Sequence, residues 1–238
     1  MQLLDILNIT GKIIVKTGLR IGAGDSEMRI GGLDNPIIKH PHTLEPYIPG
    51  SSLKGKVRSL LELQSGLVPF SKGSPLTLRH LKNQGINAAQ KAQGLKIIKL
   101  FGTGGAEEEE LLEQEIGPTR VAFADCSLNE AWKRKAMEDG LAFTEVKSEN
   151  TINRITSVAQ HPRQMERVPA GAEFDFRVSL KKFDKDAADN LDQLLLAGLK
   201  LLTLDALGGC GSRGYGRIDF HFDDADLAAQ FHNLSAFA

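Results

Sequence analysis

The order of strand-like and helix-like segments constrains the fold of this chain more than any other feature. Residues 173–180 alternate strictly between apolar and polar side chains, which predicts a strand with one buried face. A leucine-rich segment from about 186 to 207 repeats at helical spacing and stops at Gly208, a residue that suits the left-handed end of a helix. Residues 216–222 alternate again. The last third of the chain therefore predicts the order strand, helix, strand.

The first two thirds of the chain contain a matching set of segments between two insertions. Residues 8–17 are rich in β-branched side chains and predict a first strand. A helix is expected from Ser51, whose hydroxyl can cap its N-terminus, because apolar residues then recur at helical spacing. Residues 120–128 predict a further short strand. The insertions that separate these segments cover residues 66–118 and 129–172.

The resulting order is strand, helix, strand, strand, helix, strand, and it defines the fold class. It is the order of a ferredoxin-like, or RRM-like, α+β fold, in which two helices cover one face of a four-stranded antiparallel sheet. We expect the first insertion to contain helical pieces near 77–84 and 87–100. The second insertion is expected to begin with a helix over 129–140 and to continue as a polar, extended segment from 147 to 168. Because this fold carries many unrelated functions, it does not identify one by itself.

Charge is distributed unevenly, although the net charge of the 238 residues is only −1. Residues 1–104 contain 14 Lys and Arg against 6 Asp and Glu, whereas residues 105–150 contain 5 against 12. A basic first part suits a surface that binds RNA, and chance clustering around the glutamates at 107–110 is the alternative. The two cysteines form no disulfide framework or metal-binding spacing, and polar residues interrupt the apolar start of the chain. We therefore expect a cytoplasmic protein without a signal peptide or a membrane span.

The helix predicted after Pro49 has the composition of a phosphate-binding site. Ser51 and Ser52 lie at its N-terminus, where backbone N–H groups and the helix dipole attract anions. Lys54 and Arg58 are four residues apart and share a face. An ordinary amphipathic helix with a solvated basic face is the alternative.

A second candidate anion site lies between the last helix and the last strand. Five glycines fall within 208–216, among them Gly209 and Gly211, and Arg213 adds positive charge. Exposed backbone N–H groups in such a run can hold phosphates, which makes RNA contact a better explanation than a flexible turn. The order helix, glycines, strand excludes a dinucleotide-binding fingerprint, and no P-loop motif occurs. Aromatic residues, at 6%, are too few for a base-stacking platform.

Asp34 is the principal candidate for catalysis. It lies in a glycine-shaped loop next to basic segments, where a carboxylate can bind a metal ion or accept the proton of an RNA 2′-hydroxyl. An Asx turn is the structural alternative, and Asp25 presents the same ambiguity more weakly. His40 and His42 lack a third ligand at a telling distance, so we expect surface histidines.

The polar segment of the second insertion supplies further cations. It carries Arg154, Arg163 and Arg167 with few core candidates, and His161 lies among these arginines. We expect this segment to contact RNA.

Several motifs together resemble one family over nearly the whole chain. The sequence Gly-Leu-Asp-Asn-Pro at 32–36 is one of them, and Ile-Pro-Gly-Ser-Ser-Leu-Lys-Gly at 48–55 is another. The others are residues 21–26, 149–154, 162–169 and 208–216. The set is similar to the RAMP superfamily of CRISPR proteins and, within it, to the repeated backbone subunit of the type III-A (Csm) effector complex.

The resemblance implies a right-hand shape and a set of partners. The palm would comprise residues 1–21, 49–65, 119–128 and 173–238, with an Asp-bearing loop at 22–48, a helical lid at 66–118 and a thumb at 129–172. Copies of the chain would stack head to tail along a CRISPR guide RNA, beside other Csm subunits, and each thumb would displace one base pair of the guide–target duplex. Arg20 stands where relatives often carry histidine, which keeps a cation for the guide. The zinc ligands of some relatives are absent, so we expect no structural zinc.

The resemblance also assigns a reaction and leaves three hypotheses in order. First, Asp34 supports cleavage of target RNA with Mg²⁺ or another divalent cation. Second, the chain binds RNA as a structural subunit without cutting. Third, it is a ribonuclease that processes CRISPR RNA; this is the weakest hypothesis, because His40 and His42 lie away from the position such enzymes use.

Overall fold

The central element is a four-stranded antiparallel sheet with the order β2-β5-β1-β6. This computed structural model describes residues 1–24, 35–103 and 116–237. The strands are β1 (Leu3–Val15), β2 (Val121–Phe123), β5 (Glu173–Phe183) and β6 (Ile218–Phe222). Ile13 pairs with Phe174 on one side and with Phe220 on the other, so buried side chains of three strands share one face. The order and directions confirm the predicted ferredoxin-like α+β fold.

Two helices, α1 (Gly50–Gln64) and α6 (Leu191–Leu204), contribute to the same hydrophobic core as that sheet. Side chains of α1 pack directly on the backbone of α6 at Gly198, because a Cβ there would lie 2.6 Å from Val57 Cγ1. Leu53, Leu61 and Leu199 of the same two helices are completely buried. A side chain larger than hydrogen at Gly198 would push the helices apart.

The first insertion has a small core of its own. Its helices are α2 (Val68–Ser71) and α3 (Ala88–Phe101), joined through the 3-10 helix η2 (His80–Lys82). The helix expected over 77–84 is therefore mostly turns, whose leucines are buried against α3. By contrast, α3 begins where expected, because Asn87 and Gln90 form a reciprocal capping box.

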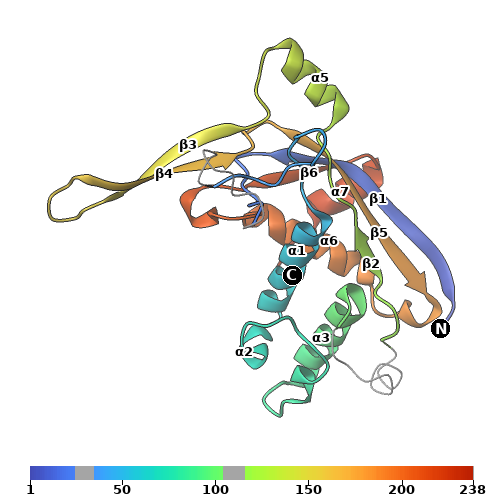
Figure 1. The fold of residues 1–238 in the computed structure, drawn as a ribbon. Coiled ribbons are helices and arrows are strands. Elements are labelled where there is room, and N and C mark those ends of the chain that lie inside the picture. Colours follow the sequence, from blue (N-terminus) through green and yellow to red (C-terminus); the bar gives the residue numbers. More distant parts are fainter. Residues whose placement is uncertain (25–34, 104–115, 238) are drawn as a thin grey trace.

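The second insertion forms a short helix and a long two-stranded hairpin. Helix α5 (Glu130–Glu138) is followed by β3 (Glu145–Ile152) and β4 (Ala159–Arg167), which pair antiparallel. The hairpin projects far from the body of the molecule (Figure 1). The polar segment at 147–168 is thus a pair of strands, and most of its side chains are exposed on both faces.

Several element boundaries differ from those expected. Strand β1 begins at Leu3 rather than near residue 8, because it continues to pair with β5 beyond the end of β6. The predicted strand 120–128 has only three ladder residues, and isolated bridges at Cys126 and Leu128 extend it. The helix expected from 186 begins at Leu191, after the 3-10 helix η3 (Asp184–Asp186).

The N-cap of α1 was predicted wrongly. Pro49, not Ser51, occupies the cap position, and the amide of Gly50 donates to Asp125 Oδ1 over 2.7 Å. Asp125 thus supplies from the chain after β2 the oxygen expected from Ser51.

Beyond β6 the chain adds helix α7 (Ala225–Asn233), which the sequence analysis did not anticipate. Asp224 caps it by accepting from the amide of Leu227, and the Phe231 ring packs against Phe222 at 5.0 Å. Among the described residues, no helix is long and apolar enough to cross a bilayer.

Candidate nucleic-acid interface

The glycine-rich loop, residues 208–216, packs directly on the chain around Arg20. The amide of Gly209 donates to the Arg20 carbonyl over 2.8 Å. Gly208 has φ +75°, and a Cβ there would lie 2.2 Å from the same carbonyl oxygen. At the other end of the loop, the Gly216 amide donates to Gly18 O over 3.0 Å. Glycine is therefore required for this close contact between two backbones.

The guanidinium of Arg20 lies under this loop without an anionic partner among the described residues. A Cβ on Gly209 would lie 3.4 Å from Arg20 Nη1, and one on Gly22 would lie 3.7 Å from Nη2. Arg20 Nε is buried and makes no hydrogen bond within the described part of the chain. A buried donor without an acceptor is costly, so the site suits a ligand that brings anionic oxygens.

Arg213 extends the positive charge of the loop toward the hairpin. It ends the short 3-10 helix η4 (Gly211–Arg213), and its Nη1 lies 3.0 Å from Glu149 Oε2 on β3. Its side chain remains 41% exposed, so solvent or a ligand can still reach the guanidinium. Arg20, Gly209, Gly211 and Arg213, four of the predicted RNA contacts, thus come together in one place.

Tyr215 connects this loop to the hairpin, and the sequence analysis missed it. Its side chain is fully buried, and its hydroxyl donates to Glu149 Oε1 over 2.7 Å. Lys147 Nζ and Arg167 Cζ lie 4.6 and 5.0 Å from the ring centroid. Burial and the bond to Glu149 raise the pKa of Tyr215 to about 12, whereas that bond lowers the pKa of Glu149. A tyrosine inside the glycine-rich run, between two glycines and two residues after Arg213, was the available sequence signal.

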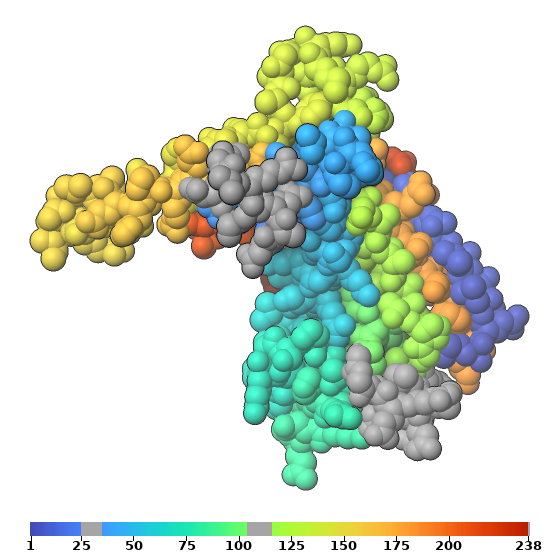
Figure 2. All heavy atoms as spheres, viewed as in Figure 1, coloured from blue at the N-terminus to red at the C-terminus, as the bar shows by residue number. Residues whose placement is uncertain are grey.

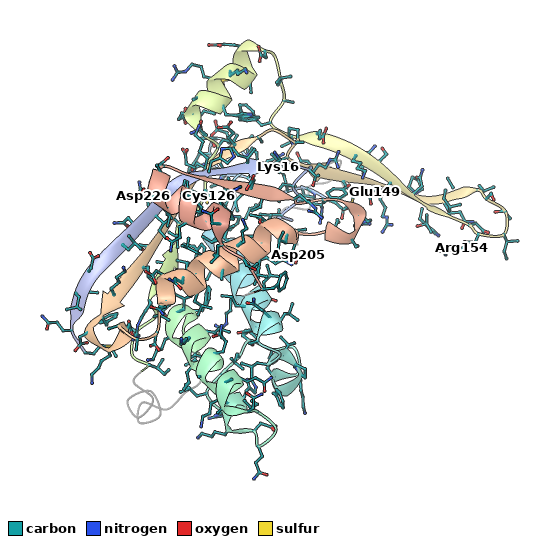
Figure 3. All side chains as sticks on the ribbon, turned by 180° about the vertical axis from the view of Figure 1, so that it is seen from behind. Lys16, Cys126, Glu149, Arg154, Asp205 and Asp226 are labelled. Atoms are coloured by element: carbon teal, nitrogen blue, oxygen red, sulfur yellow. The ribbon has the colours of Figure 1, made fainter. Side chains whose placement is uncertain are left out.

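The three predicted arginines of the hairpin occupy different environments. Arg154 is exposed at the far end of the hairpin, whereas Glu149 lies where the hairpin meets the body (Figure 3). Arg163 is exposed on β4. Arg167 is not free, because its Nε donates to Glu145 over 2.7 Å and its guanidinium covers the Tyr215 ring.

The predicted residues of α1 also separate into two groups. Ser51 is exposed, and Ser52 and Lys54 are half-buried. Burial and the neighbouring Arg58 charge lower the pKa of Lys54, which forms no ion pair among the described residues. Arg58 instead binds internally, to Glu62 (2.7 Å), Gly102 O (3.1 Å) and Leu76 O (2.6 Å). It therefore ties the first insertion to α1, and Lys54 is the better phosphate ligand.

Asp34 and Asp25 lie outside the described residues, but the chain immediately after Asp34 is well defined. Asn35 forms a parallel bridge with Met165, and its carbonyl accepts from the Glu166 amide over 3.2 Å. The buried Glu166 carboxylate holds the next residues, because it pairs with Lys39 at 2.5 Å and accepts from the Ile37 amide at 3.0 Å. Strand β4 therefore fixes the part of the Asp-bearing loop that directly follows Asp34.

The described residues contain no group of three or more His, Cys, Asp or Glu side chains suited to a metal ion. Glu166, the buried carboxylate of β4 that binds the chain after Asp34, is already paired with Lys39. A hard cation such as Mg²⁺ can bind through one carboxylate when waters and phosphate oxygens complete its shell. A magnesium site in which Asp34 is the one protein carboxylate is compatible with this mode of binding.

His40 serves a local turn, accepting at Nδ1 from the amides of His42 and Thr43 at 3.3 Å.

The space-filling view shows the hairpin as an arm that stands away from the body (Figure 2). The first insertion protrudes from the body in another direction. Of the residues in the arm, Ile155 is 94% exposed. The outer part of the arm thus presents its side chains to the surroundings of the molecule.

Comparisons of the sequence and of the fold with known proteins agree with one another. The family model of the RAMP superfamily matches residues 12–219. A Methanothermobacter thermautotrophicus protein named CRISPR system Cms endoribonuclease Csm3 is 41% identical over 227 residues, covering 89% of this chain and 82% of that protein. The protein of the same name from Enterococcus italicus is 38% identical over 222 residues, covering 92% of each chain. The crystal structure of Methanopyrus kandleri Csm3 has the same fold, with a TM-score of 0.56, 24% identity, and coverage of 93% of this chain and 76% of that one.

Proposed function

The chain belongs to the RAMP superfamily and, within it, to the Csm3 family, and on that premise we propose that it is an RNA-binding, RNA-cutting subunit of a type III-A CRISPR complex. Copies would stack head to tail along the guide RNA, in contact with other Csm subunits. Residues 129–172 would act as the thumb, 66–118 as the lid, and the remaining sheet and helices as the palm.

The observation that carries this proposal is the Arg20 guanidinium under the glycine-rich loop. Loop amides, a buried guanidinium donor without a partner among the described residues, and the exposed part of Arg213 are ligands for a phosphate backbone. Lys54 and the exposed hairpin residues Arg154 and Arg163 would add further contacts. Binding of this kind is independent of base sequence and weakens with salt, so target choice would rest on base pairing with the guide.

Asp34 would support cleavage of the target strand beside a displaced nucleotide. Distortion of the strand brings a 2′-oxygen in line with the neighbouring phosphorus. That oxygen loses its proton, forms a bond to phosphorus and expels the 5′-oxygen, which takes up a proton; the products are a 2′,3′-cyclic phosphate and a 5′-hydroxyl end. A divalent cation, held by the Asp34 carboxylate, would stabilise the negative charge that develops on the phosphorane oxygens. Strand β4 would set the position of Asp34 through Asn35.

The test is cleavage of guide-complementary RNA by the assembled complex. We compare the wild type, Asp34→Ala and the matched loop variant Asp25→Ala, each with Mg²⁺ and with EDTA. We expect evenly spaced cuts from the wild type and Asp25→Ala in Mg²⁺, and none from Asp34→Ala, which should still bind guide RNA.

Each other outcome favours a different hypothesis. Cuts that survive Asp34→Ala would remove this residue from the reaction. Absence of cutting by the wild type with intact RNA binding would leave a non-catalytic structural subunit. Cleavage of the guide precursor by the free chain would indicate a processing ribonuclease.

A further inference from the structure

The hairpin has an inner half that is bound to the body and an outer half that makes no hydrogen bond or ion pair to the described part of the body. The inner half comprises 145–149 of β3 and 163–167 of β4, which face each other in register. Met165 and Glu166 are buried there. The outer half comprises residues 151–160, in which every side chain except that of Asn153 is exposed.

Contacts on two sides fix the inner half. On one side, Glu149 accepts from the buried Tyr215 hydroxyl, and Arg167 covers the Tyr215 ring. On the other side, Glu166 holds Ile37 and Lys39. Together these contacts join the hairpin base to both the glycine-rich loop and the Asp-bearing loop.

Within the described residues, the outer half is held by its own ladder pairs, Thr151 with Gln160 and Ile152 with Ala159, and by its own turn. The amide of Asn153 donates to Val158 O over 2.9 Å, and Asn153 Oδ1 accepts from the amides of Ile155 and Thr156 at 2.9 and 3.1 Å. Over the residues the structure describes, no hydrogen bond or ion pair joins 151–160 to anything outside the hairpin. The turn is therefore a firm local unit, and the described part of the body gives it no anchor of its own.

A β-bulge separates the two halves. Pairing passes from Glu149 and Arg163 directly to Thr151 and Gln160, which leaves Asn150 on one strand opposite two residues on the other. His161 adopts φ +52°, a conformation that is unfavourable for a residue with a Cβ. Pro162, which follows it, has no N–H to donate to the ladder. Ladder pairing is thus weakest where the fixed half ends.

We propose that the outer half of the hairpin pivots as a unit about this bulge, while the bond between Tyr215 and Glu149 holds the inner half in place. Glu149 and Tyr215 are positioning residues for the arm. The proposal concerns the free chain and does not depend on the RNA chemistry proposed above. If RNA binds the glycine-rich loop, that bond connects the binding site to the base of the arm.

The experiment measures distance distributions between spin labels on the full chain without RNA. One label is placed at Gln84 in the first insertion, and the second at Ser157 in the outer half or Ser148 in the inner half; all three side chains are exposed. Cys210→Ser in every sample removes the more accessible native thiol. We expect a broad distribution for the Ser157 pair and a narrow one for the Ser148 pair.

Three variants test the two parts of the proposal, the pivot and the fixed base. His161→Gly enlarges the range of φ and ψ open to the bulge residue, so the Ser157 distribution should widen while the Ser148 distribution keeps its width. Tyr215→Phe removes only a hydroxyl, and both distributions should widen; Glu149→Gln, which loses the charge, should act in the same direction. A Ser157 distribution as narrow as that of Ser148 in the wild type would overturn the pivot. An unchanged Ser148 distribution in Tyr215→Phe and Glu149→Gln, with thermal unfolding showing that both variants fold, would overturn the positioning role.

Discussion

The Glu166 carboxylate accepts a 3.0 Å hydrogen bond from the backbone amide of Ile37, although the two residues are 129 positions apart. The same carboxylate pairs with Lys39 at 2.5 Å, and its side chain is only 4% exposed. One buried acid on β4 thus fixes two residues of the Asp-bearing loop that follow Asp34. The positions of Ile37 and Lys39 in that loop therefore depend on the base of the hairpin.

Glu166→Ala should lower the free energy of unfolding by about 2–3 kcal/mol, because the Lys39 charge and the Ile37 amide both lose their partner. Glu166→Gln keeps an acceptor for the Ile37 amide, so its loss in free energy of unfolding should be about half that of Glu166→Ala. Urea unfolding followed by circular dichroism measures both. Glu130→Ala is the control, since Glu130 pairs with Lys133 on the surface and its side chain is 73% exposed; a change below about 0.5 kcal/mol is expected. Equal losses from Glu130→Ala and Glu166→Ala would contradict the assigned role of Glu166.

Lys54 should bind RNA phosphate, whereas Lys56 on the same helix should not. Lys56 already pairs with Asp205 at 2.6 Å, and Lys54 has no ion pair among the described residues. Lys54→Gln should weaken binding of guide RNA and lower the slope of log affinity against log salt by about 1, the change expected for one lost phosphate contact. Lys56→Gln is the matched control and should leave the slope unchanged. Filter binding at several NaCl concentrations measures both, and equal slopes for the two variants would remove Lys54 from the interface.

The thiol of Cys126 should be unreactive in the folded chain. It is completely buried, and burial raises its pKa to about 12, so the reactive thiolate is scarce at neutral pH. Iodoacetamide at pH 8 should modify Cys210 and spare Cys126 until urea unfolds the chain; mass spectrometry of peptides distinguishes the two. Rapid native alkylation of Cys126 would contradict this packing.

The raised pKa of Cys126 also makes the stability of the fold decrease at alkaline pH. An unfolded chain ionises Cys126 near its ordinary pKa of about 8.5, whereas the folded chain keeps it protonated until about pH 12. The contribution is complete below about pH 8.5 and is lost as pH rises toward 12, because the unfolded state then binds fewer protons. Cys126→Ala should therefore show a smaller decline in urea midpoint between pH 8.5 and 10.5 than the wild type. Parallel declines would show that other groups account for the alkaline loss.

The local pattern of apolar and polar residues was sufficient to predict the strands of the sheet. It was insufficient to predict the contacts of the candidate interface. Phe174, Phe176 and Val178 alternate because the strand has one buried face, and that periodicity is visible in a single segment. The hairpin exposes polar side chains on both faces, so its strands have no apolar period to detect. The Arg58 contacts with Leu76 and Gly102 could not be predicted either, since they join residues that only the tertiary fold brings together. The same holds for Tyr215 and Glu149, 66 positions apart.

Two glycines of the glycine-rich loop distinguish two reasons for glycine at a position: a close contact with another backbone, and a positive φ. Gly214 and Gly216 both have positive φ, +83° and +76°. A Cβ on Gly216 would lie 2.0 Å from the Leu207 carbonyl oxygen, whereas one on Gly214 would meet nothing within 4 Å.

Gly214→Ala should therefore lower the free energy of unfolding by about 1–2 kcal/mol, the effect of placing a Cβ at positive φ alone. It should leave RNA affinity within about twofold. Gly216→Ala must in addition move the backbone of Leu207, so it should lose well over 2 kcal/mol of stability or fail to fold. Urea unfolding compares the two, and RNA binding by Gly214→Ala shows whether the loop tolerates a side chain where space exists. If Gly216→Ala were no less stable than Gly214→Ala, the contact with Leu207 would not explain why glycine stands at that position.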